Sequence, residues 1–285
     1  MKHRPNKPVL IALAVSVVLL TAIGLVRAFR PLPPLVIGIC DPLAVETASD
    51  CERASALRTY DTFARTLHAQ LGRRIVLRYY PFDAQIAAAI RSRSIDAAIA
   101  KAWTILSASC SQPLPFDRIA DLPTAKGSTD LTGVFIVRAD SPVRTLKDLN
   151  AKSILIGPVT AYEKSFAVRQ SLTEADVAPS RFEVLDGCIP LAAALLEKSS
   201  DAGVISSYVA DFDGLWLLGG AAQFREIART VPVPFLSFAV SAELPTIERA
   251  AIRDAILAMT GSQVPEGLYT TGFILPRDWE PEELK

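Results

Sequence analysis

The chain has 285 residues, which is enough to bury a large core and suits two lobes better than a single domain. Its 30 Lys and Arg residues balance its 30 Asp and Glu residues, but five of the basic residues fall within the first 30 positions, where there is no acid. The remainder is mildly acidic, with 25 basic against 30 acidic residues, which argues against nucleic acid or an anionic membrane surface as a partner.

Residues 1–30 have the pattern of an export signal. Three basic residues lie within the first seven positions, and residues 9–26 are then almost entirely apolar. This segment is long for a cleaved signal peptide and just long enough to span a bilayer, so cleavage and retention as a membrane anchor both stay open. Either outcome places the rest of the chain in the periplasm or on the outer face of the cytoplasmic membrane.

Short apolar strands alternate with helices from residue 34 to about residue 130. We expect strands over residues 35–39, 74–80 and 95–100, and helices over residues 53–71 and 84–91. Repetition of such short units predicts a parallel sheet with helices on its faces, forming the first part of a first lobe. Residues 106–128 contain three prolines and read as a surface loop.

The carboxyl ends of these strands are where a ligand is expected to bind. Asp41 follows the first strand, Lys101 follows the third, and Trp103 and Thr104 open the next helix. A lysine at a helix start is electrostatically unfavourable. Lys101 therefore either extends to solvent or pairs with an anionic ligand or a carboxylate.

A second lobe is expected over residues 131–234. Its elements are strands over residues 134–138, 153–156, 182–185 and 202–205, a short helix ending near residue 149, and helices over residues 163–175 and 188–198. The Gly-Pro loop after the second of these strands leaves backbone N–H groups directed at whatever lies above the strand end. The last strand ends at Ser206 and Ser207, also on the ligand side.

Residues 235–285 are expected to return to the first lobe. A strand over residues 235–240 crosses back, and a helix over residues 246–259 follows. Together with the strand over residues 134–138, this makes two crossings between the lobes. Two crossings form a hinge, and closure about the hinge would trap a ligand.

The order of a strand, the sequence RADSPVRTLKDL, a second strand, Gly-Pro, a hydroxyl residue and a helix resembles a known family. It is similar to the second lobe of the periplasmic solute-binding proteins of phosphate, phosphite and phosphonate ABC importers, the PhnD-like family. The resemblance covers roughly residues 34–280 and is strongest over residues 135–149. It implies a type II periplasmic-binding fold, preceded here by one N-terminal hydrophobic helix, and a small, oxyanionic ligand delivered to a membrane permease.

Two departures from that family affect the expected ligand. The relatives carry a run of small hydroxyl residues where this chain has Thr160, Ala161, Tyr162, Glu163 and Lys164. Glu163 either stabilises its helix as a dipole partner or faces the cleft, where it would repel a phosphonate and favour a cation or a metal. The family also often carries an acid near Ser206 and Ser207 to meet a substrate amine, so an amine-bearing phosphonate is not expected.

The four cysteines leave their pairing open. An even number in an exported protein suggests disulfides, and Cys40 and Cys51 could close a short loop. Cys110 is expected to be structural. Cys40 and Cys188 both follow strands on the ligand side, so an alternative site for a metal or metalloid would combine them with Glu163.

An enzyme is not predicted, and neither is a cofactor. Of the two histidines, one lies in the export segment, and His68 lies on an amphipathic helix where we expect it to face solvent. The prediction is therefore a binding protein whose lobes close on a small polar ligand. The alternative is an accessory protein that uses the same fold to dock on a membrane redox or transport complex, tethered through its N-terminal helix.

Overall fold

The structure is a computed structural model that describes residues 32–48, 58–110, 112–124, 127–211, 215, 218–259 and 272–284. The predicted export segment and its hydrophobic helix lie outside this part of the chain. Within the described ranges, no helix has the length and apolar character needed to cross a membrane.

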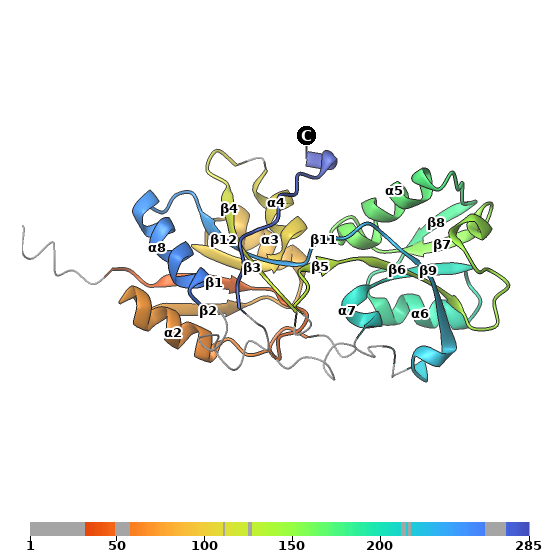
Figure 1. Ribbon diagram of the computed structural model, residues 1–285, viewed down its shortest axis with the longest axis horizontal. Helices are drawn as coiled ribbons and strands as arrows, with labels where there is room; N and C mark the ends of the chain where they lie inside the picture. The colour runs from red at the N-terminus through yellow and green to blue at the C-terminus, as the bar shows by residue number, and fades with distance from the viewer. Residues whose placement is uncertain are drawn as a thin grey trace, which may run out of the picture. The chain divides into compact units, whose positions relative to one another are not determined.

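The first sheet has five strands in the order β2-β1-β3-β12-β4 (Figure 1). The strands are β1 (Leu35–Ile39), β2 (Ile75–Tyr79), β3 (Ala97–Lys101), β4 (Phe116–Leu122) and β12 (Leu236–Ser241). β1 pairs in parallel with β2 and β3, whereas β12 is antiparallel to both β3 and β4. The predicted parallel core of the first lobe is therefore confirmed.

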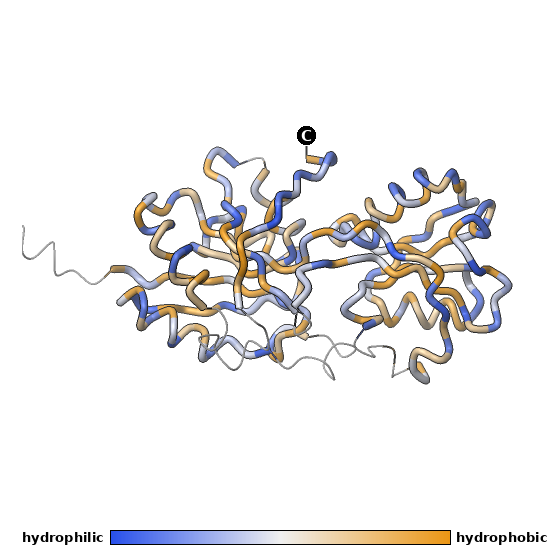
Figure 2. The backbone as a smooth tube through the Cα atoms, in the orientation of Figure 1, coloured by the Kyte–Doolittle hydropathy of each residue, from blue (hydrophilic) through white to orange (hydrophobic). Residues whose placement is uncertain are grey.

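Helices cover both faces of this sheet, because its central strands present mostly apolar side chains on both faces. The helices are α2 (Asp61–Leu71), α3 (Asp83–Arg91), α4 (Ala102–Ser109) and α8 (Thr246–Leu257). In β3, Ala97 and Ile99 belong to the buried cluster that contains residues of α2 and α8, whereas Ala98 and Ala100 belong to the cluster with α3 and α4. These strands follow hydrophobic stretches of the backbone tube in Figure 2.

The second sheet also has five strands, in the order β10-β6-β9-β7-β8. They are β6 (Gly133–Arg138), β7 (Ser153–Ile156), β8 (Arg181–Val184), β9 (Ala202–Ser206) and β10 (Phe224–Arg229). β7 pairs in parallel with β8 and β9, and β6 is antiparallel to β9 and β10. Its helices are α5 (Phe166–Glu174), α6 (Cys188–Leu196) and α7 (Ser207–Ala210), with short 3-10 helices η1 (Leu146–Leu149) and η2 (Tyr162–Lys164).

Two short antiparallel strands accompany the passage of the chain from one sheet to the other. β5 (Asp130–Leu131) precedes β6, and β11 (Val233–Pro234) precedes β12. The outward and return segments are thus hydrogen-bonded to each other where they run between the sheets. The chain thus passes between the sheets twice, as the sequence analysis expected, and the hinge expected at these crossings stays a prediction.

The structure corrects four sequence-based expectations. The helix expected from residue 53 begins at Asp61, because Arg58 pairs with Ala44 in a β-bridge, while residues 49–57 lie outside the described part. The segment expected to be a loop after residue 106 contains the end of α4 and all of β4. The helix expected from Glu163 is a 3-10 turn followed by α5. β10 was not expected.

Candidate functional site

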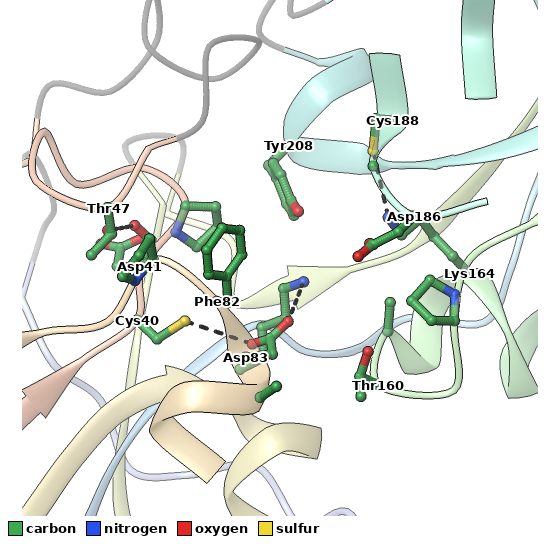
Figure 3. A pocket seen from close by; sticks show the side chains of 17 residues that line it. Cys40, Asp41, Thr47, Phe82, Asp83, Thr160, Lys164, Asp186, Cys188 and Tyr208 are labelled. Atoms are coloured by element: carbon green, nitrogen blue, oxygen red, sulfur yellow. Dashed lines mark hydrogen bonds and ion pairs between the residues drawn. The ribbon is translucent and has the colours of Figure 1, made fainter. Parts of the chain in front are cut away.

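A cavity of about 400 Å³ lies at the carboxyl ends of the central strands and is lined by residues that follow strands of both sheets. Its first-sheet wall includes Cys40 and Asp41 after β1, the start of α3 at Asp83, and Lys101 at the end of β3. Figure 3 shows Lys164, Cys188 and Tyr208 on the opposite wall, facing these residues across the cavity. The cavity therefore lies at the strand ends, where the sequence analysis expected a ligand to bind, and ligand binding there stays a prediction.

Asp41 lines the cavity, but its carboxylate is already engaged. It is fully buried, and its Oδ2 accepts hydrogen bonds from the Arg58 guanidinium and the Tyr60 hydroxyl, each at 2.7 Å. Its Oδ1 accepts the Leu43 amide at 2.9 Å. Burial and the Asp41 charge raise the pKa of Tyr60 well above its usual value. This cluster fixes the loop after β1, and Asp41 positions the cavity wall rather than offering a free carboxylate.

Lys101 lies between two carboxylates. Its Nζ is 3.3 Å from Asp83 Oδ2 and 3.8 Å from Glu163 Oε1, and only 7% of the residue is exposed. Burial by itself would lower the pKa of Lys101, but the nearby Asp83, Tyr208 and Glu163 raise it well above its usual value. The interpretation in which Lys101 extends to solvent is therefore wrong, and its partners are carboxylates.

Asp83 accepts hydrogen bonds from several side chains of the first sheet unit. Besides Lys101, it accepts the Thr104 hydroxyl at 2.9 Å and the Cys40 thiol at 3.7 Å, both on Oδ1. Burial and the Asp83 carboxylate raise the pKa of Cys40 well above its usual value. Asp83 opens α3, where a carboxylate is favoured by the helix dipole.

Glu163 faces inward and connects the two walls. It is 1% exposed, and its Oε1 accepts the Ser206 hydroxyl at 2.6 Å on one side and approaches Lys101 on the other. Its inward direction follows from the tight η2 turn, which places three consecutive buried side chains before α5 begins. Glu163 therefore points toward Lys101 from behind the cavity wall and does not line the cavity itself.

Lys164 is a buried cation of the cavity wall with no carboxylate partner among the described residues. Its side chain lines the cavity, the residue is 5% exposed, and its Nζ donates to the Cys188 Sγ at 3.7 Å. Within the described part of the chain, no carboxylate oxygen lies within 4.0 Å of this ammonium group. Burial would lower the pKa of Lys164, but Cys188 and Glu163 hold it above the usual value.

An aromatic junction lies behind the cavity. The Trp103 indole N–H donates to the Val159 carbonyl at 2.9 Å, and its ring lies 5.0 Å from that of Tyr162 and 5.4 Å from that of Phe166. Trp279 contacts Tyr162 edge-on at 5.1 Å. Burial and Glu283 raise the pKa of Tyr162 to about 12. Trp103 and Tyr162 thus join α4 to the segment after β7 and do not line the cavity.

The structure separates the predicted site residues into two sets. The cavity is lined by Asp41, Lys101, Thr160, Ala161 and Lys164. The other predicted residues, which lie behind this wall or elsewhere, are Trp103, Thr104, Tyr162, Glu163, Ser206 and Ser207. Ser207 instead accepts the Thr132 amide at 3.2 Å and lines a second cavity of about 430 Å³ beside β5 and β11.

Three ionisable residues of the cavity wall were missed by the sequence analysis. Asp83 follows β2 and is the first residue of α3, and Asp186 follows β8 and precedes α6. The strand-end rule could therefore have selected both residues. Tyr208 lies in α7, directly after the Ser206 and Ser207 pair. Its ring faces the Lys101 ammonium, which lies 5.6 Å from the ring centroid.

The described cysteines are free thiols. Cys40 and Cys188 are buried, Cys110 is exposed, and Cys51 lies outside the described residues. Cys40 and Cys188 both line the cavity, as the alternative metal site required. However, the described residues contain no group of three His, Cys, Asp or Glu side chains able to hold a metal ion. His68 is exposed, as expected.

Comparison with protein families places most of the chain in one group. Residues 47–279 match the family described as "ABC transporter, phosphonate, periplasmic substrate-binding protein". A search of curated proteins found no significant match.

Solved structures support the same fold. XAC2383 from Xanthomonas citri bound to ATP aligns with a TM-score of 0.64 and 17% identity, covering 87% of this chain and 92% of that one. PhnD1 from Prochlorococcus marinus in complex with methylphosphonate aligns with a TM-score of 0.63 and 14% identity, covering 85% and 92%. A binding protein component of an ABC phosphonate transporter from Pseudomonas aeruginosa gives 0.62 and 16%, covering 86% and 82%. At these identities, the similarity concerns the fold.

Proposed function

The chain belongs to the family of periplasmic substrate-binding proteins of phosphonate ABC transporters, and on this premise we propose that it binds a small oxyanion in the cavity between its two sheets for delivery to an ABC permease. The family acts by binding substrates for transport, in agreement with the predicted export to the periplasm. The proposal adds to this the class of ligand and the residues that hold it.

The observation that carries the proposal is the state of Lys164. A buried ammonium group is costly unless an anion compensates it. Lys101 has two carboxylates for this purpose. Lys164 has the sulfur of Cys188 and an open cavity in front of it. An oxyanion in the cavity would supply the missing charge.

The surroundings of Lys164 offer further donors to the same anion. Gly187 and Cys188 line the cavity at the start of α6, and Gly187, the N-cap residue, provides no side-chain cap. The first N–H groups of a helix therefore remain available there, and the helix dipole favours negative charge. Thr160 lines the cavity as well and contributes a hydroxyl group. In this arrangement Lys101 joins the two walls and Lys164 binds the ligand.

The proposal is tested by a thermal-shift screen against phosphate, phosphite and methylphosphonate. A ligand that binds only the folded state at 100 times its Kd adds about 2.7 kcal/mol, or roughly 5–10 °C for a protein of this size. Lys164→Gln should abolish the shift. The matched control is Lys147→Gln, because Lys147 is exposed on η1 of the same sheet unit, and it should leave the shift intact. Equal shifts in both variants would refute the role of Lys164, and no shift in the unmodified protein would refute an oxyanion ligand.

A further inference from the structure

Two groups of ion pairs use up most of the positive charge in the cavity wall. Asp41 pairs with Arg58 at 2.7 Å, so these two residues add no net charge. Lys101 lies 3.3 Å from Asp83 and 3.8 Å from Glu163, so this group of three carries one more negative charge than positive. Neither group therefore has a positive charge left for a ligand.

Lys164 supplies the positive charge that remains, and it supplies only one. Among the described residues that line the cavity and their ion-pair partners, the cations are Arg58, Lys101 and Lys164, and the carboxylates are Asp41, Asp83, Glu163 and Asp186. Asp186 is exposed, so solvent screens part of its charge. The other ionisable groups of the lining, Cys40, Cys188 and Tyr208, can only add negative charge.

The start of α6 adds a partial positive charge beside Lys164. Together, Lys164 and the helix start can compensate about one negative charge on a ligand. A second negative charge would lose its water without gaining a partner, which is costly in a buried site. It would also be repelled by the surplus negative charge around Lys101. The cavity therefore favours a singly charged anion over a doubly charged one.

The size of the cavity indicates a ligand larger than an inorganic ion. Its volume of about 400 Å³ lies within the range of about 300–1,000 Å³ that is typical of pockets for organic ligands. Phe82 lines the first-sheet wall across the cavity from Lys164, as Figure 3 shows, and is 65% exposed. Pro42 and Pro81 line the cavity as well. The apolar part of a ligand bound at Lys164 would cover the Phe82 ring and remove apolar surface from water.

We propose that the ligand is an organic anion with a single negative charge, such as a sulfonate, a carboxylate or a singly ionised phosphonate, and that the site rejects dianions. The charged group lies at Lys164 and the start of α6, and the apolar part lies against Phe82. This inference rests on the proposed oxyanion site and names the class of substrate that the site selects.

The test compares methanesulfonate with methylphosphonate, which are similar in shape and differ in charge. Methanesulfonate keeps one negative charge, whereas methylphosphonate gains a second one as the pH rises. Calorimetry with the full chain gives the Kd of both ligands from below to above the second ionisation of methylphosphonate. Beyond that point each pH unit lowers the fraction of the monoanion about tenfold, so the apparent Kd of methylphosphonate should rise about tenfold per unit. The Kd of methanesulfonate reports any titration of the protein itself and should change little.

Glu163→Gln tests the count of charges. Glutamine keeps an oxygen that can accept the Ser206 hydroxyl, but the substitution removes one of the two carboxylates of Lys101. The site should then accept the dianion, so the rise in the Kd of methylphosphonate with pH should become shallow. Asp186→Asn, at an exposed position, should act in the same direction but less strongly. The matched control is Glu174→Gln, on an exposed position of α5, which should keep the tenfold rise. Thermal unfolding without ligand checks that each variant is folded.

Benzenesulfonate tests the apolar part of the ligand. It should bind about tenfold more tightly than methanesulfonate, because its ring is buried against Phe82, and Phe82→Ser should remove the difference. Kd values of methylphosphonate and methanesulfonate that change in parallel with pH, or equal affinities for the two sulfonates, would overturn the proposal and leave an oxyanion site in place. If none of these anions binds at any pH, the oxyanion site itself is refuted, so the two failures are distinguishable.

Discussion

Replacing Trp103 should loosen the contact between the two lobes more than it disturbs either core. Its indole N–H donates to the Val159 carbonyl at 2.9 Å, and its ring contacts Tyr162 and Phe166. Trp103 lies near the amino end of α4, which packs on the first sheet. Its partners follow β7 of the second sheet. These contacts join the two sheet units, and under the predicted hinge closure they would be lost on opening.

The magnitude follows from the two kinds of contact. Trp103→Phe keeps an aromatic ring and loses one hydrogen bond, which is worth about 0.5–1.5 kcal/mol. Trp103→Ala removes the whole buried side chain, for which about 3–5 kcal/mol is typical. If about 3 kcal/mol of this loss destabilises the closed form relative to the open form, the ratio of closed to open protein drops roughly 100-fold. Where the closed form no longer predominates, the apparent Kd rises as its population falls.

Two measurements distinguish closure from global stability. Small-angle X-ray scattering should give a larger radius of gyration for Trp103→Ala, and calorimetry with an oxyanion found by the thermal-shift screen should give a weaker Kd. Trp103→Phe should lie between this variant and the unmodified protein. If Trp103→Ala lowers the unfolding free energy but leaves both the radius of gyration and the Kd unchanged, Trp103 is an ordinary core residue and the argument is wrong.

Three further substitutions test the framework of the site. Gly133→Ala should lower the urea midpoint by an amount equivalent to about 1–3 kcal/mol, because an added Cβ would lie 2.1 Å from the backbone oxygen of Glu163. Arg58→Met should cost about 3–5 kcal/mol by leaving Asp41 buried and unpaired, and a second change, Asp41→Asn, should restore part of this loss. Asp201→Asn should flatten the loss of thermal stability below about pH 4. Burial by itself would raise the pKa of Asp201, but hydrogen bonds from the backbone N–H and the hydroxyl of Ser153 outweigh it, so the net pKa is lowered. The stabilisation by the ionised carboxylate is therefore present above the unfolded pKa and is lost as the pH falls. An acid profile identical to that of the unmodified protein would contradict the last prediction.

The sequence predicted the central strands well, but only one edge strand of each five-stranded sheet. β1, β3, β7 and β9 are short apolar runs, and a run of this kind is distinctive because both faces of a parallel strand are covered. In the five-stranded sheets the two strands that were missed, β4 and β10, are outermost strands and mix polar with apolar residues, as in FDRIADL and FREIAR. Prolines at positions 113, 115 and 123 flank β4 and suggested a loop. Half-covered strands of this kind are recognised by their pairing, which the local sequence does not contain.

The location of the cavity could be predicted, but the roles of its residues could not. The strand-end rule selected Asp41, Lys101 and the loop after β7 without reference to their partners. What each side chain does depends on contacts between distant segments. Lys101 and Glu163 are 62 positions apart in the sequence and 3.8 Å apart across the cavity wall. No periodicity or motif encodes such a pair, so the sequence left open whether either residue faced solvent, ligand or protein.

The pairing of charges would allow the proposed oxyanion to bind beside a loop that carries a glutamate. A glutamate in that loop would by itself oppose an oxyanion. In the structure, the Glu163 carboxylate accepts a hydrogen bond from Ser206 and forms an ion pair with Lys101. Its charge is therefore largely compensated inside the protein. The next residue, Lys164, then provides a positive charge that is not used by a carboxylate. Exchanging the two residues, as Glu163→Lys with Lys164→Glu, would retain the composition of the loop but place a lysine against Lys101 and a carboxylate in the cavity. This double variant should therefore lose both the oxyanion shift and several degrees of thermal stability, whereas a loop that contributed only its backbone N–H groups would keep the shift.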